Sequence, residues 1–407
     1  MFFFFFFDEL KQESAGEVSQ TSANKGEWSE IYTMFKLLAD GKLYDGDESY
    51  NKKPNSYYPI LQILREEHLR TGKNDYRYEI EDNERPDNGN SKSVAVYENG
   101  ELIMKLSSDN FVAASKQLFD DIVNGHGRSF KTSAANEAFM RKIHCKNIKR
   151  DADHKADVTI HLYDAVVGRR PVVAFSIKSL IGGAPTLLNT SDATLITYSV
   201  KGREFSDEEV KEINAITGNS KLKRRLQAIY AKGASIEFKS FDSQVFMCNL
   251  QLIDYGLPTV LASCVLKYFS SERISMVKEL AKKVAEDNPL SYCCANREQF
   301  YIEKMTKLLV ASALGMYPSK QFNGENEANG YIVVKEDGEL VCYHFYDMGM
   351  VRRHLLENTK FDTPASSKMA KDKDGKPKGF QRKPYCVLYR NEEGELEIKL
   401  NFQIRWA

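Results

Sequence analysis

Residues 156–179 read ADVTIHLYDAVVGRRPVVAFSIKS, and this stretch decides the fold of the chain. Apolar and polar side chains alternate in residues 157–162 and again in 173–178, and a period of two is typical of β-strands. The residues between them are charged and include Gly168, which suits a turn. The stretch therefore predicts two antiparallel strands joined by a hairpin loop.

The two predicted strands bring together residues that can do chemistry. Ser176 and Lys178 are two positions apart, so they point to one face of the sheet. A turn centred between Val167 and Gly168 places Asp157 opposite Lys178, on that same face. Asp157 offers the oxygen ligand that Mg²⁺ prefers, and Lys178 can orient and activate a water. The hairpin therefore predicts a site suited to metal-dependent phosphodiester hydrolysis.

This pattern resembles that of the PD-(D/E)xK nucleases, in which an Asp and a spacer precede an acid or a serine, one further residue and a lysine. Ser176 stands where the pattern usually has an acid. A solvated polar face that happens to carry Asp and Lys is much commoner, so the pattern alone points only weakly to a nuclease. His161 shares the face of Asp157, and we expect it to be a structural histidine with satisfied hydrogen bonds.

Composition sets broad limits on the fold and the function. The 407 residues suffice for one large domain or for two or three ordinary ones, and 42 % apolar content supports a buried core. The 57 basic and 57 acidic residues balance, so only their local distribution can indicate a nucleic-acid partner. Seven scattered cysteines without a CxxC pair argue against a zinc site and indicate reduced thiols in a cytoplasm.

The chain divides into a short leader and one long unit. Residues 1–23 begin with six phenylalanines after the first methionine, and we expect a disordered leader. The apolar run is too short to span a membrane, and it lacks the basic region and cleavage site of a signal peptide. Residues 24–407 are expected to form one compact unit, with a catalytic core at about 130–245 and a helical recognition part at about 246–407.

Residues 24–41 predict an amphipathic helix, because apolar side chains recur at helical spacing. Asn24 and Glu27 are spaced as a capping box, so capping is the expected role of Glu27. Glu30 flanks the apolar stripe and has no such local role. It is therefore the better candidate for a functional site.

The rest of the sequence predicts further helices and hairpins and contains three basic segments. The sequence predicts a helix at 58–71, hairpins at 93–106 and 331–345, and a series of helices across 244–315. Lysine and arginine gather in three segments, 128–150, 221–232 and 366–383, the last of which is expected to be a mobile loop. Such segments are either solvated surface or contacts for phosphate groups.

The chain resembles the HpaII-type family of type II restriction endonucleases from residue 24 to its C-terminus. The most specific matches are NKGEWSEIYTMFKLL from Asn24, FSIKSLIGGAPTLLN from Phe175 and the ending LNFQIRW. The resemblance implies an α/β, restriction-endonuclease-like fold: a mixed central sheet flanked by helices, with a large helical elaboration and C-terminal strands. It also implies Mg²⁺-dependent cleavage of double-stranded DNA at the site CCGG.

The catalytic motif of the family corresponds here to Asp157, Ser176 and Lys178. As implied metal ligands we take Asp157 and the backbone carbonyl of Ile177. A further acid is expected, because Ser176 supplies no carboxylate.

Three residues compete for the role of this further acid. In some nucleases with a serine at this position that recognise CCGG-containing sites, a downstream acid takes the place of the missing one, which points to Asp192. Glu30 on the first helix is an equal candidate, and Glu27 is a third. The second metal ligand therefore stays open between these three.

The resemblance also implies partners. Double-stranded DNA is the expected substrate, a symmetric homodimer is expected on a palindromic site, and a DNA methyltransferase is expected as a genetic partner only. Two other classes stay open: a DNA-binding protein with a degenerate nuclease site, of which Ser176 would be the sign, and a metabolic α/β enzyme. The chain has no G-x-G-x-x-G, G-x-x-x-x-G-K-[ST] or H-E-x-x-H motif, which argues against the second.

Overall fold

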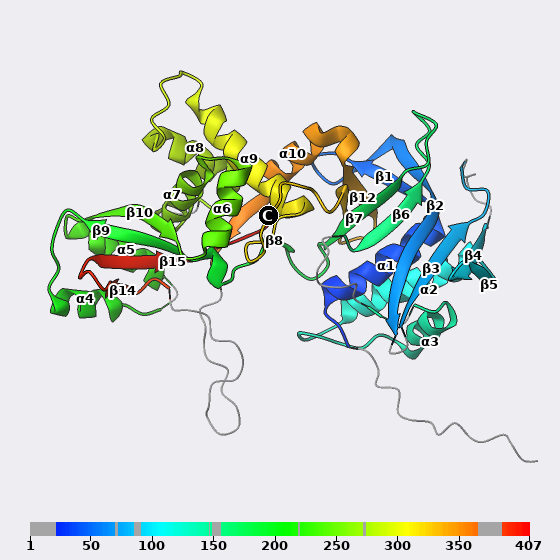
Figure 1. Cartoon of the computed structure of the whole chain (residues 1–407). Helices are drawn as coiled ribbons and strands as arrows, with labels where there is room; N and C mark the ends of the chain where they lie inside the picture. The colour runs from blue at the N-terminus through cyan, green and yellow to red at the C-terminus, as the bar shows by residue number, and fades with distance from the viewer. Residues whose placement is uncertain are drawn as a thin grey trace, which may run out of the picture.

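The computed structural model describes residues 22–69, 72–84, 91–145, 147–148, 156–218, 220–271, 274–364 and 385–407. The chain is an α/β protein whose two lobes lie side by side (Figure 1). Each lobe surrounds an apolar core of its own. The predicted leader and the predicted loop at 366–383 fall almost entirely outside the described residues. Ser22 and Ala23 are the exceptions, and Ala23 is buried and pairs with Phe130 in an isolated bridge.

The first lobe is built on a nine-stranded mixed sheet in the order β1-β12-β11-β7-β6-β2-β3-β4-β5. Its strands are β1 (Lys42–Gly46), β2 (Lys52–Leu69), β3 (Gly72–Ile80), β4 (Ser93–Glu98), β5 (Glu101–Ser107), β6 (Val158–Leu162), β7 (Val172–Ser179), β11 (Gly330–Val334) and β12 (Leu340–His344). The long strand β2 pairs with β1 through its first half and with β3 and β6 further along. The sheet therefore curls back on itself.

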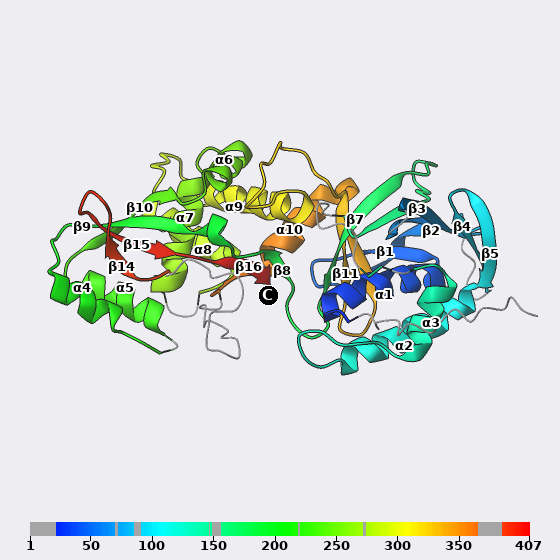
Figure 2. The ribbon, with the colours of Figure 1, turned by 60° about the horizontal axis from the view of Figure 1, so that its bottom comes forward.

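Three helices cover one side of this sheet (Figure 2): α1 (Lys25–Asp40), α2 (Ser108–Asn124) and α3 (Ala134–Lys142). The predicted first helix is confirmed, with a complete Asn24–Glu27 capping box at its start and Gly41 in the left-handed region at its end. The apolar stripe of α1, which includes Trp28 and Phe35, is fully buried.

The helix predicted at 58–71 is wrong, because these residues belong mainly to strand β2. The side chains of Ile63, Arg65 and Glu67 all point inwards, two positions apart, as in any half-buried strand. Two of these inward positions hold an ion pair instead of apolar residues. The charged residues therefore hide the period of two that would have indicated a strand.

The second lobe combines two small sheets with seven helices among the described residues. One sheet has the order β10-β9-β15-β14 and the other β13-β16-β8. Their strands are β8 (Thr186–Leu188), β9 (Ile196–Lys201), β10 (Ser235–Phe241), β13 (Thr359–Asp362), β14 (Leu388–Arg390), β15 (Leu396–Leu400) and β16 (Gln403–Trp406).

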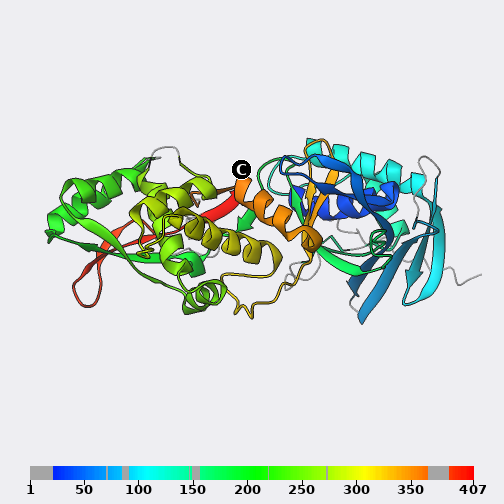
Figure 3. The same cartoon turned by 90° about the horizontal axis from the view of Figure 1, so that it is seen from above.

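The helices of this lobe are α4 (Asp207–Asn214), α5 (Lys221–Ala231), α6 (Gln244–Ile253), α7 (Leu257–Ser270), α8 (Val277–Asp287), α9 (Arg297–Leu314) and α10 (Met348–Glu357). Seen from above, α4 to α9 gather at one end of an elongated molecule, whereas α10 lies between this end and the large sheet (Figure 3). The predicted helical series across 244–315 is confirmed.

The two lobes meet at the predicted hairpin of β11 and β12, which is confirmed. Ile332 and Val334 on one face of the hairpin belong to the core of the first lobe. Tyr331 and Tyr343 on the other face belong to the core of the second lobe, and α10 packs against β12 there. This hairpin therefore contributes side chains to the cores of both lobes.

Within the described ranges no single helix is long and apolar enough to cross a membrane. Helices α6 and α7 meet that criterion only together, and they are bent by 109° relative to each other. All seven cysteines lie in the described part of the chain and are free thiols.

Candidate active site

The predicted hairpin of β6 and β7 is present, but its register differs from the prediction by two residues. Val158 pairs with Phe175, which sets Asp157 across from Ser176 and not from Lys178. The reason lies in the turn, where the carboxylate of Asp164 accepts hydrogen bonds from the backbone N–H groups of Val166 and Val167. The turn is therefore centred between Val166 and Val167, one residue earlier than predicted, and this displacement shifts the register by two residues.

The corrected register still gathers the predicted residues at one end of the hairpin. The backbone N–H of Ile177 donates to a carboxylate oxygen of Asp157 over 2.6 Å, which fixes that side chain beside β7. Ser176 is fully buried, and its hydroxyl has no hydrogen-bond partner in the described part of the protein. An orphaned hydroxyl of this kind is costly and marks a place where a ligand can supply the missing partner.

Helix α1 brings a second carboxylate to this place. Its Ser29 hydroxyl donates to the hydroxyl of Ser179 over 2.8 Å, so that the helix is fastened to the last residue of β7. Glu30, the next residue of the helix, is half-buried. It interacts electrostatically with both Asp157 and Lys178. The structure therefore brings Glu30 together with the residues of the hairpin.

The electrostatics of Glu30 are those of a crowded acid. Burial raises its pKa from 4.5 to about 8, and the negative charge of Asp157 adds to the increase. Lys178 and Arg65 act in the opposite direction. No sequence pattern singles out Arg65, because its segment, 58–71, has the spacing that predicts a helix.

The donor set fits a hydrated magnesium ion. Asp157 and Glu30 supply carboxylate oxygens, and Ser176 supplies an unpaired hydroxyl oxygen. Mg²⁺ prefers oxygen ligands, keeps several waters and needs only one or two protein carboxylates. A cation would also offset the repulsion that raises the pKa of Glu30. No group of three or more His, Cys, Asp or Glu side chains in the described ranges could hold a metal by itself.

The other two candidate acids have different surroundings. Glu27 accepts a hydrogen bond from the backbone N–H of Asn24 over 2.9 Å, which confirms its predicted capping role. Asp192 begins a 3-10 turn (Asp192–Thr194) between β8 and β9, next to the capping residue Ser191. It is not among the groups with the largest effects on the pKa of Glu30.

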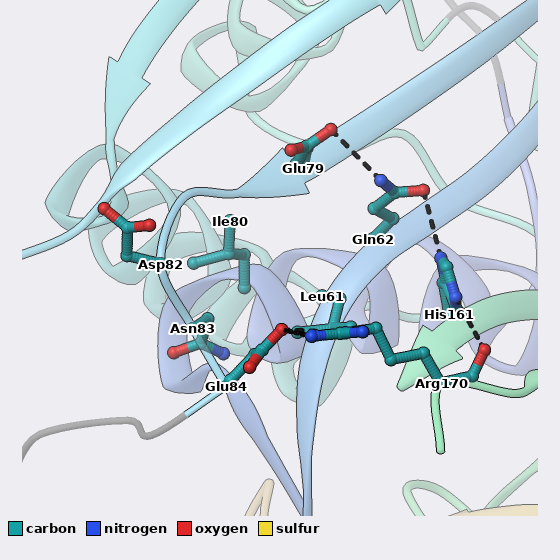
Figure 4. Close-up of a pocket in the computed structure, with 9 residues that line it drawn as sticks. All are labelled: Leu61, Gln62, Glu79, Ile80, Asp82, Asn83, Glu84, His161 and Arg170. Carbon is teal, nitrogen blue, oxygen red and sulfur yellow. Dashed lines mark hydrogen bonds and ion pairs between the residues drawn. The ribbon is translucent and has the colours of Figure 1, made fainter. Parts of the chain in front are cut away.

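His161 takes part in a chain of polar contacts on the sheet, as Figure 4 shows. One of its ring nitrogens lies 3.3 Å from the amide oxygen of Gln62, and the other lies 2.7 Å from the backbone carbonyl of Arg170. Gln62 in turn donates to Glu79. The residues of these polar contacts line a pocket of about 550 Å³. Both nitrogens of His161 are thus engaged, which confirms the predicted structural role.

One of the basic segments contains an arginine that is turned inwards. Arg225 on α5 is buried and donates to the backbone carbonyls of Cys386, Asn214 and Ile216, so it holds the second lobe together. Residues 128–150 are described only in part, and 366–383 lie outside the described residues. A role of these segments in contacting phosphates stays a prediction.

Comparison with known proteins defines the class to which this fold and this site belong. The curated protein "Type II restriction enzyme HpaII" of Haemophilus parainfluenzae is 35 % identical over 386 residues, which cover 95 % of this chain and 98 % of the relative. No solved structure matches the chain with significance. The class is therefore that of type II site-specific endonucleases, whose substrate is double-stranded DNA.

The family itself is equally clear. A sequence model of the HpaII restriction endonuclease family matches residues 24–406, which is nearly the whole chain. The chain belongs to the HpaII restriction endonuclease family.

Proposed function

We propose that this chain cleaves both strands of DNA at CCGG and that it requires Mg²⁺. Family membership supports the class of reaction. One observation carries the assignment of the site: helix α1 brings the carboxylate of Glu30 within electrostatic reach of Asp157 and Lys178 at the end of β7. We also propose that the nine-stranded sheet with its helices is a restriction-endonuclease-like core.

Each residue of the site has a proposed role. Asp157 and Glu30 would hold the ion, together with the backbone carbonyl of Ile177, and the hydroxyl of Ser176 would contact the ion or one of its waters. When bound, Mg²⁺ supplies charge that offsets the negative charge developing on the scissile phosphate. Lys178 orients the attacking water by donating a hydrogen bond from its ammonium group.

The oligomeric state, the genetic partner and the cellular location are also proposed. A four-base palindrome presents two equivalent scissile phosphates, and a symmetric homodimer would place one site on each strand. We propose such a dimer on DNA, with a DNA methyltransferase as genetic partner. The seven free thiols fit a cytoplasmic location.

The test is digestion of plasmid DNA with Mg²⁺, followed by sequencing of the fragment ends. The proposed function predicts ends at CCGG, and no cutting when a cytosine of that site carries a methyl group in the major groove. Ends at another sequence, or equal cutting of methylated DNA, would contradict the proposed specificity. Retardation of DNA without cutting would instead indicate a binding protein with a degenerate site.

Asp157→Asn and Lys178→Ala test the assignment of the site. Each is expected to lower the single-turnover cleavage rate by on the order of 10²–10⁴. Both side chains are half-buried at the end of a hairpin and neither fills the core, so folding and DNA binding should persist. Rates near that of the wild type would mean that the catalytic residues lie elsewhere.

A further inference from the structure

The sequence ending LNFQIRW, which includes strand β16, has no part in the site described above. In the small sheet β13-β16-β8, every second side chain points into the core of the second lobe, as Phe361, Ile404 and Trp406 do. The alternate positions form a polar face, which is half-buried. This polar face consists of Thr186, Lys360, Asp362, Gln403 and Arg405.

Arg405 is held in place at the centre of the polar face. Its guanidinium donates to the backbone carbonyl of Ala184 from Nε and from Nη2, over 3.2 Å and 2.5 Å, and it pairs with Asp362 from Nη1 over 3.3 Å. The same oxygen of Asp362 accepts from the amide of Gln403 over 2.7 Å. About a third of the Arg405 side chain is exposed.

These contacts leave the guanidinium with capacity for a partner. An arginine has five N–H donors, and the contacts made within the described chain use three of them. The two remaining donors belong to the two terminal nitrogens. A planar group that is oriented in advance loses little conformational freedom on binding, and its fork matches paired acceptors.

The position of the polar face relative to the candidate active site is set by a short connection. Residues 179–184 link Lys178 on β7 to Ala184. The backbone carbonyl of Ala184 accepts hydrogen bonds from the guanidinium of Arg405. Six extended residues reach at most about 21 Å. A four-base-pair site extends over roughly 14 Å along the duplex, since each base pair adds about 3.4 Å. A duplex with its scissile phosphate at Lys178 can therefore also present its bases to this face.

Figure 2 shows where the small sheet lies, with β8 and β16 between the large sheet and the remainder of the second lobe. Neighbouring strands are about 4.8 Å apart, so the backbones of this three-stranded sheet span about 10 Å, which is less than the width of about 12 Å of the major groove. Guanine presents there two acceptors, O6 and N7, and a bidentate arginine is the commonest specific partner of this pair.

We infer that the polar face of β13, β16 and β8 reads the bases of the DNA substrate, and that Arg405 recognises a guanine through O6 and N7 in the major groove. Asp362 is a positioning residue, because it holds Arg405 and Gln403 in one orientation. The inference rests on the proposed function, since it takes double-stranded DNA with guanines in the site as the ligand. It adds the residues that distinguish that site from other sequences.

The experiment combines changes in the protein with changes in the DNA. The duplexes carry the site found by sequencing digested ends, or 7-deazaguanine in place of one guanine at a time, which removes the N7 acceptor. Dissociation constants are measured with Ca²⁺ in place of Mg²⁺ for the wild type, Arg405→Lys and Arg405→Gln. Arg353→Gln is the control, because Arg353 is an exposed arginine that is likewise paired with a carboxylate, that of Glu48 on the first lobe.

We expect the wild type and Arg353→Gln to lose roughly tenfold or more in affinity at one particular guanine when its N7 is removed. Arg405→Lys and Arg405→Gln should bind all duplexes weakly and show no further loss at that guanine. Arg405→Lys retains the charge, so it should still bind unrelated DNA as the wild type does. Melting temperatures within a few degrees of the wild type show that the variants are folded.

Two results would overturn the inference. If Arg405→Lys and Arg405→Gln keep the full loss at every modified guanine, the residue is structural and the bases are read elsewhere. If the wild type prefers no sequence at all, the proposed function fails, and the inference fails with it. The two cases are distinguished by the wild-type data alone.

Discussion

Glu30 occupies a position where a carboxylate is unfavourable in the metal-free protein. Burial and the charge of Asp157 both raise its pKa, so folding works against the ionised form. Glu67, by contrast, is a buried acid with a structural role, because it forms an ion pair with Arg65 over 2.5 Å. An acid crowded against a second acid is instead expected where a cation binds both.

Exchange of Glu30 for Gln distinguishes this residue from the competing acids. Glu30→Gln should lower single-turnover cleavage of plasmid DNA by on the order of 10²-fold or more, because one of two anionic ligands is lost. Asp192→Asn should change the rate only a few-fold. Glu27→Gln is the matched control on the same helix: the amide oxygen of Gln can still accept from the backbone N–H of Asn24, so both stability and cutting should stay close to those of the wild type. A large loss with Asp192→Asn alone would assign the second carboxylate to the downstream loop.

Ser176→Ala should make the protein more stable and, at the same time, less active. The hydroxyl is fully buried and has no partner in the described chain, so its removal should raise the free energy of unfolding of the metal-free protein by about 1 kcal/mol. Cleavage should fall less than in Asp157→Asn, because a water can replace a hydroxyl at a hydrated ion. Urea unfolding without metal measures the first effect, and a loss of stability would show that the hydroxyl has a partner.

At the scale of elements, the ends of α1, β2 and β7 determine the site. Ser29 fastens α1 to the end of β7, and the hairpin bond from Ile177 to Asp157 fixes β6 against the same strand. On β2, Arg65 donates to Glu67 and to the backbone carbonyl of Asn147. Glu67 also accepts from the backbone N–H of Asn147. The inner ion pair therefore attaches the chain before β6 to the sheet.

Arg65→Met should be strongly destabilising. It leaves Glu67 buried without its cation, and breaking a buried pair typically costs about 3–5 kcal/mol. The double variant Arg65→Met with Glu67→Leu should recover much of this loss. Glu66 lies on the same strand as Arg65 and forms an exposed pair with Lys73 of β3, so Glu66→Gln should melt as the wild type does. Thermal unfolding checks all three, and an equal effect of the exposed and the buried pair would contradict the interpretation.

The sequence could predict elements whose pattern is local. The cap at Asn24, the alternation in β7 and the apolar stripes of α6 to α9 all lie within a few residues, and these elements are confirmed. β2 was missed because an ion pair takes two inward positions. The hairpin register was missed because a side chain of Asp164 closes the turn earlier than the glycine suggests.

The candidate site was only partly visible for a related reason. Glu30 stood out because it lacked a capping role, yet its approach to Asp157 depends on how α1 packs on the sheet. The polar face around Arg405 joins strands from three distant parts of the sequence. No local pattern reports such long-range pairing. The division into a catalytic core at about 130–245 and a recognition part at about 246–407 stays a prediction.

At the scale of the whole molecule, the junction between the two lobes contains a buried histidine. His354 on α10 is stacked on the ring of Tyr343, with ring centroids 3.7 Å apart, and one nitrogen lies 2.7 Å from the hydroxyl of Tyr331. Its Nε2 has no partner in the described chain. Tyr50, which lies between β1 and β2, meets the same ring edge-on. The lobes therefore depend on an uncharged imidazole at this point.

His354 makes one contribution to the pH dependence of stability, because burial lowers its pKa from 6.5 to about 3 even though Asp47 acts in the opposite direction. The unfolded chain then binds a proton that the folded protein does not, so the stability contributed by this group is complete above pH 6.5 and is lost as the pH falls below it. Between pH 6.5 and 5 the expected loss is about 2 kcal/mol, because one pH unit corresponds to about 1.36 kcal/mol.

His354→Gln should be less stable than the wild type at pH 7, because the stacking on Tyr343 is weakened, but its stability should fall less steeply on acidification. The measurement is urea unfolding at pH 7, 6 and 5, with His126→Gln as control, since His126 is exposed beyond the end of α2. The two curves of unfolding free energy against pH should converge towards pH 5. Because His354 lies where the lobes meet, the excess loss in the wild type should also appear as earlier protease cleavage between them. Parallel curves for the wild type and His354→Gln would show that the junction tolerates a charged imidazole.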